Sequence, residues 1–64
     1  MTEQEVNEIL DKLASREIEA HLVEKHEFLA FRNVLVKRED FKHFRGIAQH
    51  GGNVLYQYLD EARS

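Results

Sequence analysis

Apolar side chains recur at helical spacing near the start of the chain. They follow one another at intervals of three and four residues: Val6, Ile9, Leu10 and Leu13. Just before this stripe, Thr2 and Glu5 match the capping box T-x-x-E, in which each side chain bonds the backbone N–H of the other residue. The pattern predicts an amphipathic helix over residues 3–14.

The pattern over residues 15–24 is compatible with two kinds of element. From Glu17 to Leu22, polar and apolar residues alternate, as they do in a half-buried strand. Leu10, Ala14, Ile18 and Leu22 also step by four residues, which would continue the first helix. Glutamate and alanine are poor strand formers and favour the helix locally. The choice therefore depends on what this segment can pair with later in the chain.

Two further helical stripes follow, and they are out of phase. Phe28, Phe31 and Leu35 predict a helix over residues 24–36, and the second stripe is Phe41, Phe44, Ile47 and Ala48. The 13 residues from Phe28 to Phe41 correspond to about 220° of rotation, so the stripes cannot share one face of a straight helix. A long helix with a break near residues 37–40 is predicted, with Asp40 as the N-cap of its second piece.

The two stripes also repeat a short pattern. Residues 27–32 and 40–45 both match [ED]-F-x-x-F-R. We interpret the phenylalanines as core residues, and Arg32 and Arg45 as the polar rim of the helix.

The last third of the chain begins with glycines. Gly51 and Gly52 are predicted to end the second helical piece as its C-cap, and Gly46 to permit close packing of helices. Residues 54–59 are rich in β-branched and aromatic side chains and favour a strand, although Asn53 could cap a helix there. Because a strand needs a partner and residues 17–23 are the one candidate, both segments are predicted to be strands.

These elements predict an α+β fold, a small domain over residues 1–64 with the order α-β-α-β and a two-stranded sheet. Two strands make a marginal sheet in water, and a chain of this length buries only about 60% of its unfolded surface. Pairing across a two-fold axis would extend the sheet to four strands, so a homodimer is expected. An all-α bundle of three or four helices is the alternative.

Composition narrows the class of protein. The chain has no cysteine, so nothing marks it for an oxidising compartment. Its first ten residues are acidic and lack the apolar core of a signal peptide, and no run approaches the roughly 20 apolar residues that span a membrane. We expect a cytoplasmic protein without a membrane segment, of the kind found among bacterial and phage accessory proteins.

The net charge of -3 is unevenly distributed. Residues 1–24 carry seven acids against two bases, and residues 25–46 carry six bases against three acids. The acidic front and the basic middle could bind each other, within the fold or across a dimer. The alternative is that both stretches carry ordinary solvated helix charge.

Residues with catalytic or metal-binding chemistry are sparse. His21, His26, His43 and His50 include no pair at the i, i+4 spacing of a helical two-histidine site, so no metal site is predicted. Serine occurs only at positions 15 and 64 and threonine only at 2, which leaves no hydroxyl near the histidine-rich region for nucleophilic catalysis. Neither an enzyme activity nor a cofactor is expected.

The expected function is therefore binding, in a small interaction or regulatory protein with an acidic protein partner. The predicted binding surface is a basic rim together with a His-Gly-Gly loop: Lys37, Arg38, Lys42, His43, Arg45 and His50. The alternative is weak nucleic-acid binding by the basic strip from Lys37 to Arg45. An isoelectric point near 5.7 speaks against this alternative, because dedicated nucleic-acid binders are usually basic.

Overall fold

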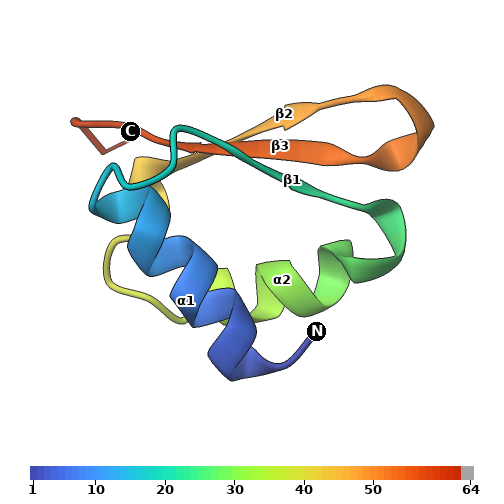
Figure 1. The fold of residues 1–64 in the computed structure, drawn as a ribbon, viewed down its shortest axis with the longest axis horizontal. Coiled ribbons are helices and arrows are strands. Elements are labelled where there is room, and N and C mark those ends of the chain that lie inside the picture. The colour runs from blue at the N-terminus through green and yellow to red at the C-terminus, as the bar shows by residue number, and fades with distance from the viewer. Residues whose placement is uncertain (63–64) are drawn as a thin grey trace.

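Two helices lie against one face of a three-stranded sheet in the computed structural model, which describes residues 1–62 (Figure 1). The elements follow in the order α1 (Glu3–Ala14), β1 (His21–Val23), α2 (Phe28–Leu35), β2 (Phe44–Ala48) and β3 (Val54–Tyr58). Single 3₁₀ turns lie at Lys25–Glu27, Phe41–His43 and His50–Gly52. The α+β class is confirmed, and the sheet speaks against the all-α bundle.

The first helix has the predicted bounds and the predicted cap. Glu5 donates its backbone N–H to Thr2 Oγ1 at 3.1 Å, and Thr2 donates its backbone N–H to Glu5 Oε1 at 3.4 Å. Both bonds of the capping box are therefore present. Val6, Leu10 and Leu13 are buried on the face that meets the rest of the core.

The C-terminal end of α1 explains why the helix does not continue into residues 15–22. Arg16 has a left-handed backbone with φ 68°. Its N–H bonds the carbonyl of Leu13, and the N–H of Glu17 bonds the carbonyl of Lys12. This is the geometry of a Schellman motif, with arginine where glycine is usual. The Arg16 side chain compensates by donating to the carbonyl of Tyr58 at 2.9 Å and pairing with Asp60.

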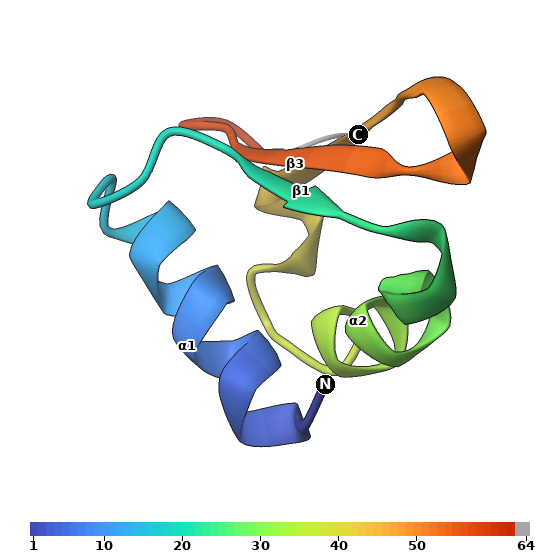
Figure 2. The same ribbon diagram turned by 45° about the vertical axis from the view of Figure 1, so that its right-hand side comes forward.

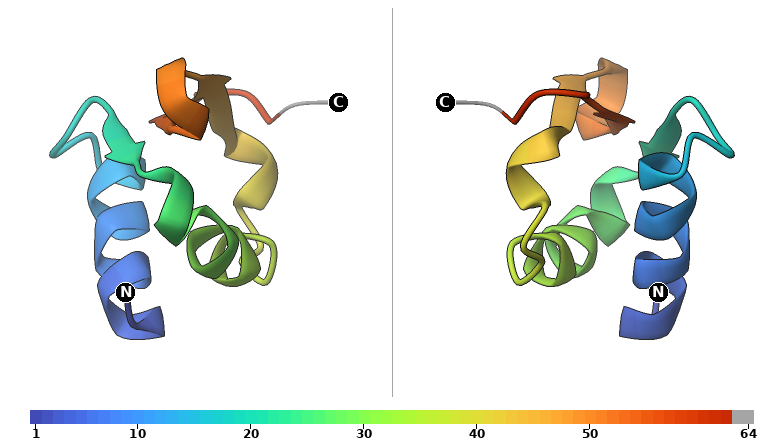
Figure 3. Two further views of the ribbon diagram at one scale, coloured as in Figure 1. Left: turned by 90° about the vertical axis from the view of Figure 1, so that its right-hand side faces the viewer. Right: turned by 90° about the vertical axis from the view of Figure 1, so that its left-hand side faces the viewer.

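The sheet has the order β1-β3-β2, with both pairings antiparallel. The predicted pairing of the segments around residues 17–23 and 54–59 is confirmed, although only His21–Val23 of the first segment is a strand. The prediction of two strands was wrong, because Phe44–Ala48 pairs with the other edge of β3. The end views in Figure 3 show the resulting layers, with both helices on one side of the sheet.

The helical piece that was predicted between Asp40 and Gly51 was therefore wrong. Phe41–His43 forms one 3₁₀ turn, and the chain then becomes extended with Phe44 buried and Arg45 exposed. Phe44 lies opposite Tyr58, and Gly46 lies opposite Tyr56, so the alternation of β2 matches that of β3. The predicted break near residues 37–40 is confirmed, since α2 ends at Leu35.

Gly51 and Gly52 lie in the loop of the β2–β3 hairpin, so their predicted role as a helix C-cap was also wrong. Their φ angles are 75° and 82°, a region that L side chains rarely adopt. Gln49 donates its backbone N–H to the carbonyl of Asn53 at 2.8 Å and closes the loop. The Asn53 side chain accepts from the backbone N–H of Lys25 at 3.0 Å, which ties the hairpin loop to the turn after β1.

One core joins all five elements. The rings of Phe31 and Tyr56 lie 4.9 Å apart at its centre, and Phe28 and Phe41 pack at its margin. The predicted role of the phenylalanines in the core is thus confirmed. Neither helix within residues 1–62 is long and apolar enough to cross a membrane. The buried residues are Val6, Leu10, Leu13, Val23, Phe31, Val34, Leu35, Phe44 and Tyr56.

Candidate functional site

Arg38, one of the predicted binding residues, holds the loop after α2 against α1. Its guanidinium donates to both carboxylate oxygens of Asp40, at 2.9 and 3.3 Å. It also reaches Asp11 at 2.9 Å and Asn7 at 3.1 Å, both on α1. Its side chain is only 20% exposed and lies over the ring of Phe44. Most of its hydrogen-bonding capacity is therefore used within the fold.

Asp40 does not act as the predicted N-cap. Its side chain makes no capping bond to the turn that follows, because the carboxylate is held by Arg38 instead. The hydrogen bonds from Arg38 lower the pKa of Asp40 below its ordinary value, against a smaller opposing effect of burial. The contact between Asp11 and Arg38 also shows the acidic front and the basic middle of the chain meeting within one fold.

His43, a second predicted binding residue, also makes contacts within the fold. Its Nδ1 lies 2.8 Å from the carbonyl oxygen of Leu59, which can only accept, so Nδ1 carries the proton of this bond. Its ring stacks on Tyr58 with the centroids 5.1 Å apart. The backbone N–H of Leu59 bonds the carbonyl of His43 in return. His43 thus joins the end of β3 to the start of β2.

The other four predicted residues lie in different elements of the fold. Lys37 follows α2 on the helix side of the sheet, and Lys42 lies in the 3₁₀ turn before β2. Arg45 is opposite Gln57 and points away from the helices, and His50 lies in the hairpin loop. All four are exposed. Binding by these side chains stays a prediction, but the structure spreads them over different parts of the molecule.

A groove of about 370 Å³ lies between α2 and the sheet. Figure 2 shows the arrangement of the two elements, with α2 beneath the end of the sheet that carries the hairpin. One wall comes from α2 and the segment after it, and the other from the helix-facing side of β2 and β3. The apolar lining consists of Phe28, Leu35, Val36, Phe41, Phe44, Gly46, Ala48, Val54 and Tyr56.

Small residues on β2 form the part of this groove that is nearest the sheet edge. Gly46 and Ala48 face the helices, each opposite a larger residue of β3. A Cβ at position 46 would lie 3.0 Å from Cγ1 of Val54 and 3.3 Å from Cε1 of Tyr56. The predicted role of Gly46 in helix packing was therefore wrong, because its close contacts are with side chains of the neighbouring strand.

Arg32 is the one charged side chain that lines the groove. It is exposed, and no ion pair of Arg32 occurs among residues 1–62. An exposed guanidinium at the rim of an apolar groove can bind a carboxylate through two hydrogen bonds while apolar groups occupy the groove itself. The arrangement is thus suited to binding an apolar group with a nearby negative charge.

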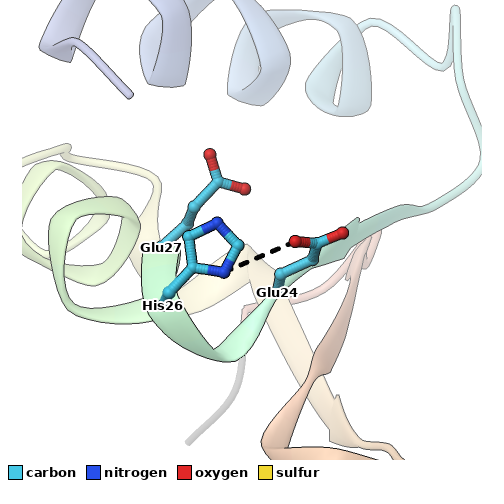
Figure 4. Close-up of side chains that lie close together, drawn as sticks. All are labelled: Glu24, His26 and Glu27. Carbon is cyan, nitrogen blue, oxygen red and sulfur yellow. Dashed lines mark ion pairs between the residues drawn. The ribbon is translucent and has the colours of Figure 1, made fainter.

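A second cluster of polar side chains lies in the turn after β1 (Figure 4). Glu24, His26 and Glu27 bring three potential metal-ligand atoms within 4.8 Å of one another. His26 Nδ1 lies 3.4 Å from Glu24 Oε2, and these two side chains are 73% and 60% exposed. Their i, i+2, i+3 spacing is not that of a helical metal motif, so sequence reasoning did not single them out. The cluster has no buried polar group that would orient it, and we assign it no role.

The groove was also missed in the sequence. Its helix wall uses Phe28, Arg32 and Val36, which are four residues apart and therefore share one face of α2. This spacing is present in the sequence, but Arg32 was interpreted only as part of the polar rim of the helix and not as part of a binding site. Its sheet wall required the knowledge that residues 44–48 form a strand.

The chain matches a known protein family. The profile of a family named YkzS, described as YkzS-like protein, matches residues 3–57. No curated protein and no solved structure matches the chain.

Proposed function

The chain belongs to the family of YkzS-like proteins, and we propose that it is a small interaction protein that binds a segment of another protein without catalysis. The binding site we propose is the groove between α2 and the sheet. Of the basic residues at this site, Arg32 lines the groove and was not part of the predicted binding surface, whereas Arg45 was predicted and lies on the other face of β2. Arg38 and His43 make their contacts within the fold.

The observation that carries this proposal is the open apolar groove. Val36, in its helix wall, is 43% exposed, which leaves apolar surface in contact with water. The lining offers a single charged group, Arg32, whereas small-molecule sites usually have several converging polar groups that fix the orientation of the ligand. A segment of a protein, held by apolar side chains and one carboxylate, is the occupant that these walls favour.

Two exposed arginines support an acidic partner. Arg32 of α2 lines the groove. Arg45 is on the edge strand β2, on the face that points away from the groove. In contrast, the strip from Lys37 to Arg45 offers less to nucleic acid than the sequence suggested, because Asp11 and Asp40 offset the charge of Arg38. Titration of duplex DNA and RNA at two salt concentrations tests this alternative. A steep salt slope that is lost in Lys42→Ala and Arg45→Ala would favour it.

The three-stranded sheet removes one reason to expect a homodimer. The homodimer was inferred from a two-stranded sheet, and β2 now supplies a third strand within one chain. The two edge strands leave room for a second copy, so a homodimer stays a prediction. Sedimentation at micromolar concentration tests it, and a folded monomer under those conditions would remove it.

The proposal is tested by affinity capture from the source cell with two matched variants. Val36→Glu places a charge in the groove wall, and Leu29→Glu places the same charge on an α2 residue that is 71% exposed and outside the groove lining. We expect protein bands that the wild type and Leu29→Glu retain and Val36→Glu loses, with both variants shown to be folded by circular dichroism. Equal capture by both variants would count against the groove.

A further inference from the structure

The edge of β2 that faces away from β3 presents free backbone groups. Two backbone bonds bracket the ladder between these strands, Leu59 N–H to His43 C=O at 2.6 Å and Gln49 N–H to Asn53 C=O at 2.8 Å. In an antiparallel pair, hydrogen-bonded positions alternate, so Arg45 and Ile47 are the residues of β2 that bond β3. The N–H and C=O groups of Gly46 and Ala48 therefore point outward.

This edge lacks the usual protection. The order β1-β3-β2 places no strand beyond β2 among residues 1–62, and Gly46 and Ala48 are exposed. At its start, Phe44 uses its N–H to bond Phe41 within the preceding turn. The rest of the edge carries no proline and no inward-pointing charge, which are common devices against pairing with another chain.

The groove lies beneath this edge. Gly46 and Ala48 face the helices with no side chain larger than a methyl group, and both line the groove. Side chains of a strand alternate between the two faces of a sheet. A strand added beside β2 would therefore direct every second side chain into the groove, toward Val36 and Arg32 of its helix wall.

We propose that an extended segment of a partner protein adds to β2 as a fourth strand. Its inward side chains are large and apolar and occupy the groove, and an inward carboxylate beside them pairs with Arg32. An outward acidic side chain meets Arg45 on the other face of β2. This inference rests on the proposed function and specifies how the partner segment binds, by strand addition.

A second copy of this chain is a less suitable occupant. Self-pairing about Gly46 would bring the Gly46 and Ala48 of that copy to the edge, and neither has a side chain that can occupy the groove. Its Phe44 is fully buried in its own core and is not free to do so. Arg32 in the groove and Arg45 on the other face of β2 also favour an acidic segment over a second basic strand.

The test uses peptides selected from a phage-displayed library of random twelve-residue sequences against the immobilised full-length protein. The probe is the tightest binder whose binding is lost in Val36→Glu and kept in Leu29→Glu. We expect alternating apolar residues with acids among them. When this peptide saturates the protein, hydrogen exchange of the Gly46 and Ala48 amides should slow roughly tenfold or more, because each gains a ladder bond.

Methylation of single backbone nitrogens in the probe supplies the matched control. In an antiparallel or parallel addition, only every second peptide N–H faces β2. Methylation at those positions should weaken binding roughly tenfold, and methylation at the intervening positions should leave it nearly unchanged. A peptide that bound in the groove as a helix would not show this alternating effect of methylation.

Three outcomes would overturn the inference, and they are distinguishable. If the peptide binds but the Gly46 and Ala48 amides are unaffected and methylation has no alternating effect, the groove binds without strand addition and the proposed function stands. If these amides are already protected in the free protein, increasingly so at higher concentration, a second copy occupies the edge. If no selected peptide depends on Val36, the proposed function fails together with the inference.

Discussion

The guanidinium of Arg38 holds the carboxylate of Asp40 through two side-chain hydrogen bonds, from Nε to Oδ1 at 2.9 Å and from Nη2 to Oδ2 at 3.3 Å. The same guanidinium contacts Asp11 and Asn7 of α1 and lies over Phe44 of β2. One side chain in the loop after α2 thereby connects this loop to a helix and to a strand. Such a residue stabilises the fold, although its sequence context suggested a binding surface.

Replacing Arg38 should therefore destabilise the protein more than replacing any exposed arginine. We expect Arg38→Met to lower the free energy of unfolding by about 2 kcal/mol, because charged hydrogen bonds are lost and the partly buried carboxylate of Asp40 is left without a partner. Arg38→Lys should recover only part of this, since an ammonium group cannot donate in the same fork. Urea denaturation measures both.

The control for this prediction is Arg45→Met, at an exposed position on the sheet. It should change the free energy of unfolding by no more than about 0.5 kcal/mol. Equal effects at positions 38 and 45 would show that the network around Arg38 adds no stability.

Acid should weaken the protein partly through Asp40. Its pKa is lowered in the fold by the hydrogen bonds from Arg38, whereas in the unfolded chain it titrates near the ordinary value of about 3.9. Between the two pKa values the unfolded state therefore binds more protons than the folded state. The contribution of Asp40 to stability is complete at a pH above the unfolded pKa. It is lost as the pH falls through the lowered folded value.

Asp40→Asn isolates this contribution from that of the other acids. We expect the difference in unfolding free energy between wild type and variant to be largest near about pH 6 and to shrink towards about pH 3. Urea denaturation across this range measures the difference. Parallel pH profiles for the two proteins would mean that Asp40 is not the group responsible.

His43 should contribute through its bond to Leu59. His43→Phe keeps a ring that can stack on Tyr58 but removes the Nδ1–H donor, so we expect a loss of about 1 kcal/mol. His50→Phe at the exposed hairpin loop is the matched control and should change stability little. Thermal unfolding of the two variants compares them. If His43→Phe is as stable as the wild type, the hydrogen bond between His43 and Leu59 does not contribute to stability.

Hydrogen exchange in the free protein should alternate along β2. The amides of Arg45 and Ile47 bond β3 and should exchange slowly, whereas those of Gly46 and Ala48 face outward and should exchange quickly. Residue-resolved exchange by NMR at low protein concentration measures this. Similar protection at all four positions would show that the edge is covered.

The sequence predicted best where local interactions decide the structure. The capping box and the apolar stripe of α1 lie within 12 consecutive residues, and the helix has the predicted bounds. Residues 54–58 form a strand as their β-branched and aromatic composition indicated. The end of the first helix was less clear, because Arg16 adopts a left-handed backbone without glycine and is compensated by contacts with Tyr58 and Asp60.

The segment from Phe41 to Ala48 shows the limit of the pattern. Its apolar spacing matches one face of a helix, and no regular alternation of polar and apolar residues marks the strand that Phe44–Ala48 forms. Pairing with β3 decided between helix and strand, because β3 offers a second edge where Gly46 can lie beneath Val54 and Tyr56. Pairing with residues that lie 6 to 14 positions further along the chain outweighed the local helical preference.

The sequence by itself determined the class of the fold, the first helix, the last strand and the phenylalanines of the core, since each depends on the order of neighbouring side chains. The tertiary structure alone decided the third strand, the groove between α2 and the sheet, and the engagement of Arg38 and His43 within the fold. These features depend on contacts between different elements, which the order of neighbouring side chains does not determine. The sequence around Arg38 does not indicate whether its guanidinium contacts solvent, another protein or Asp11 on the first helix.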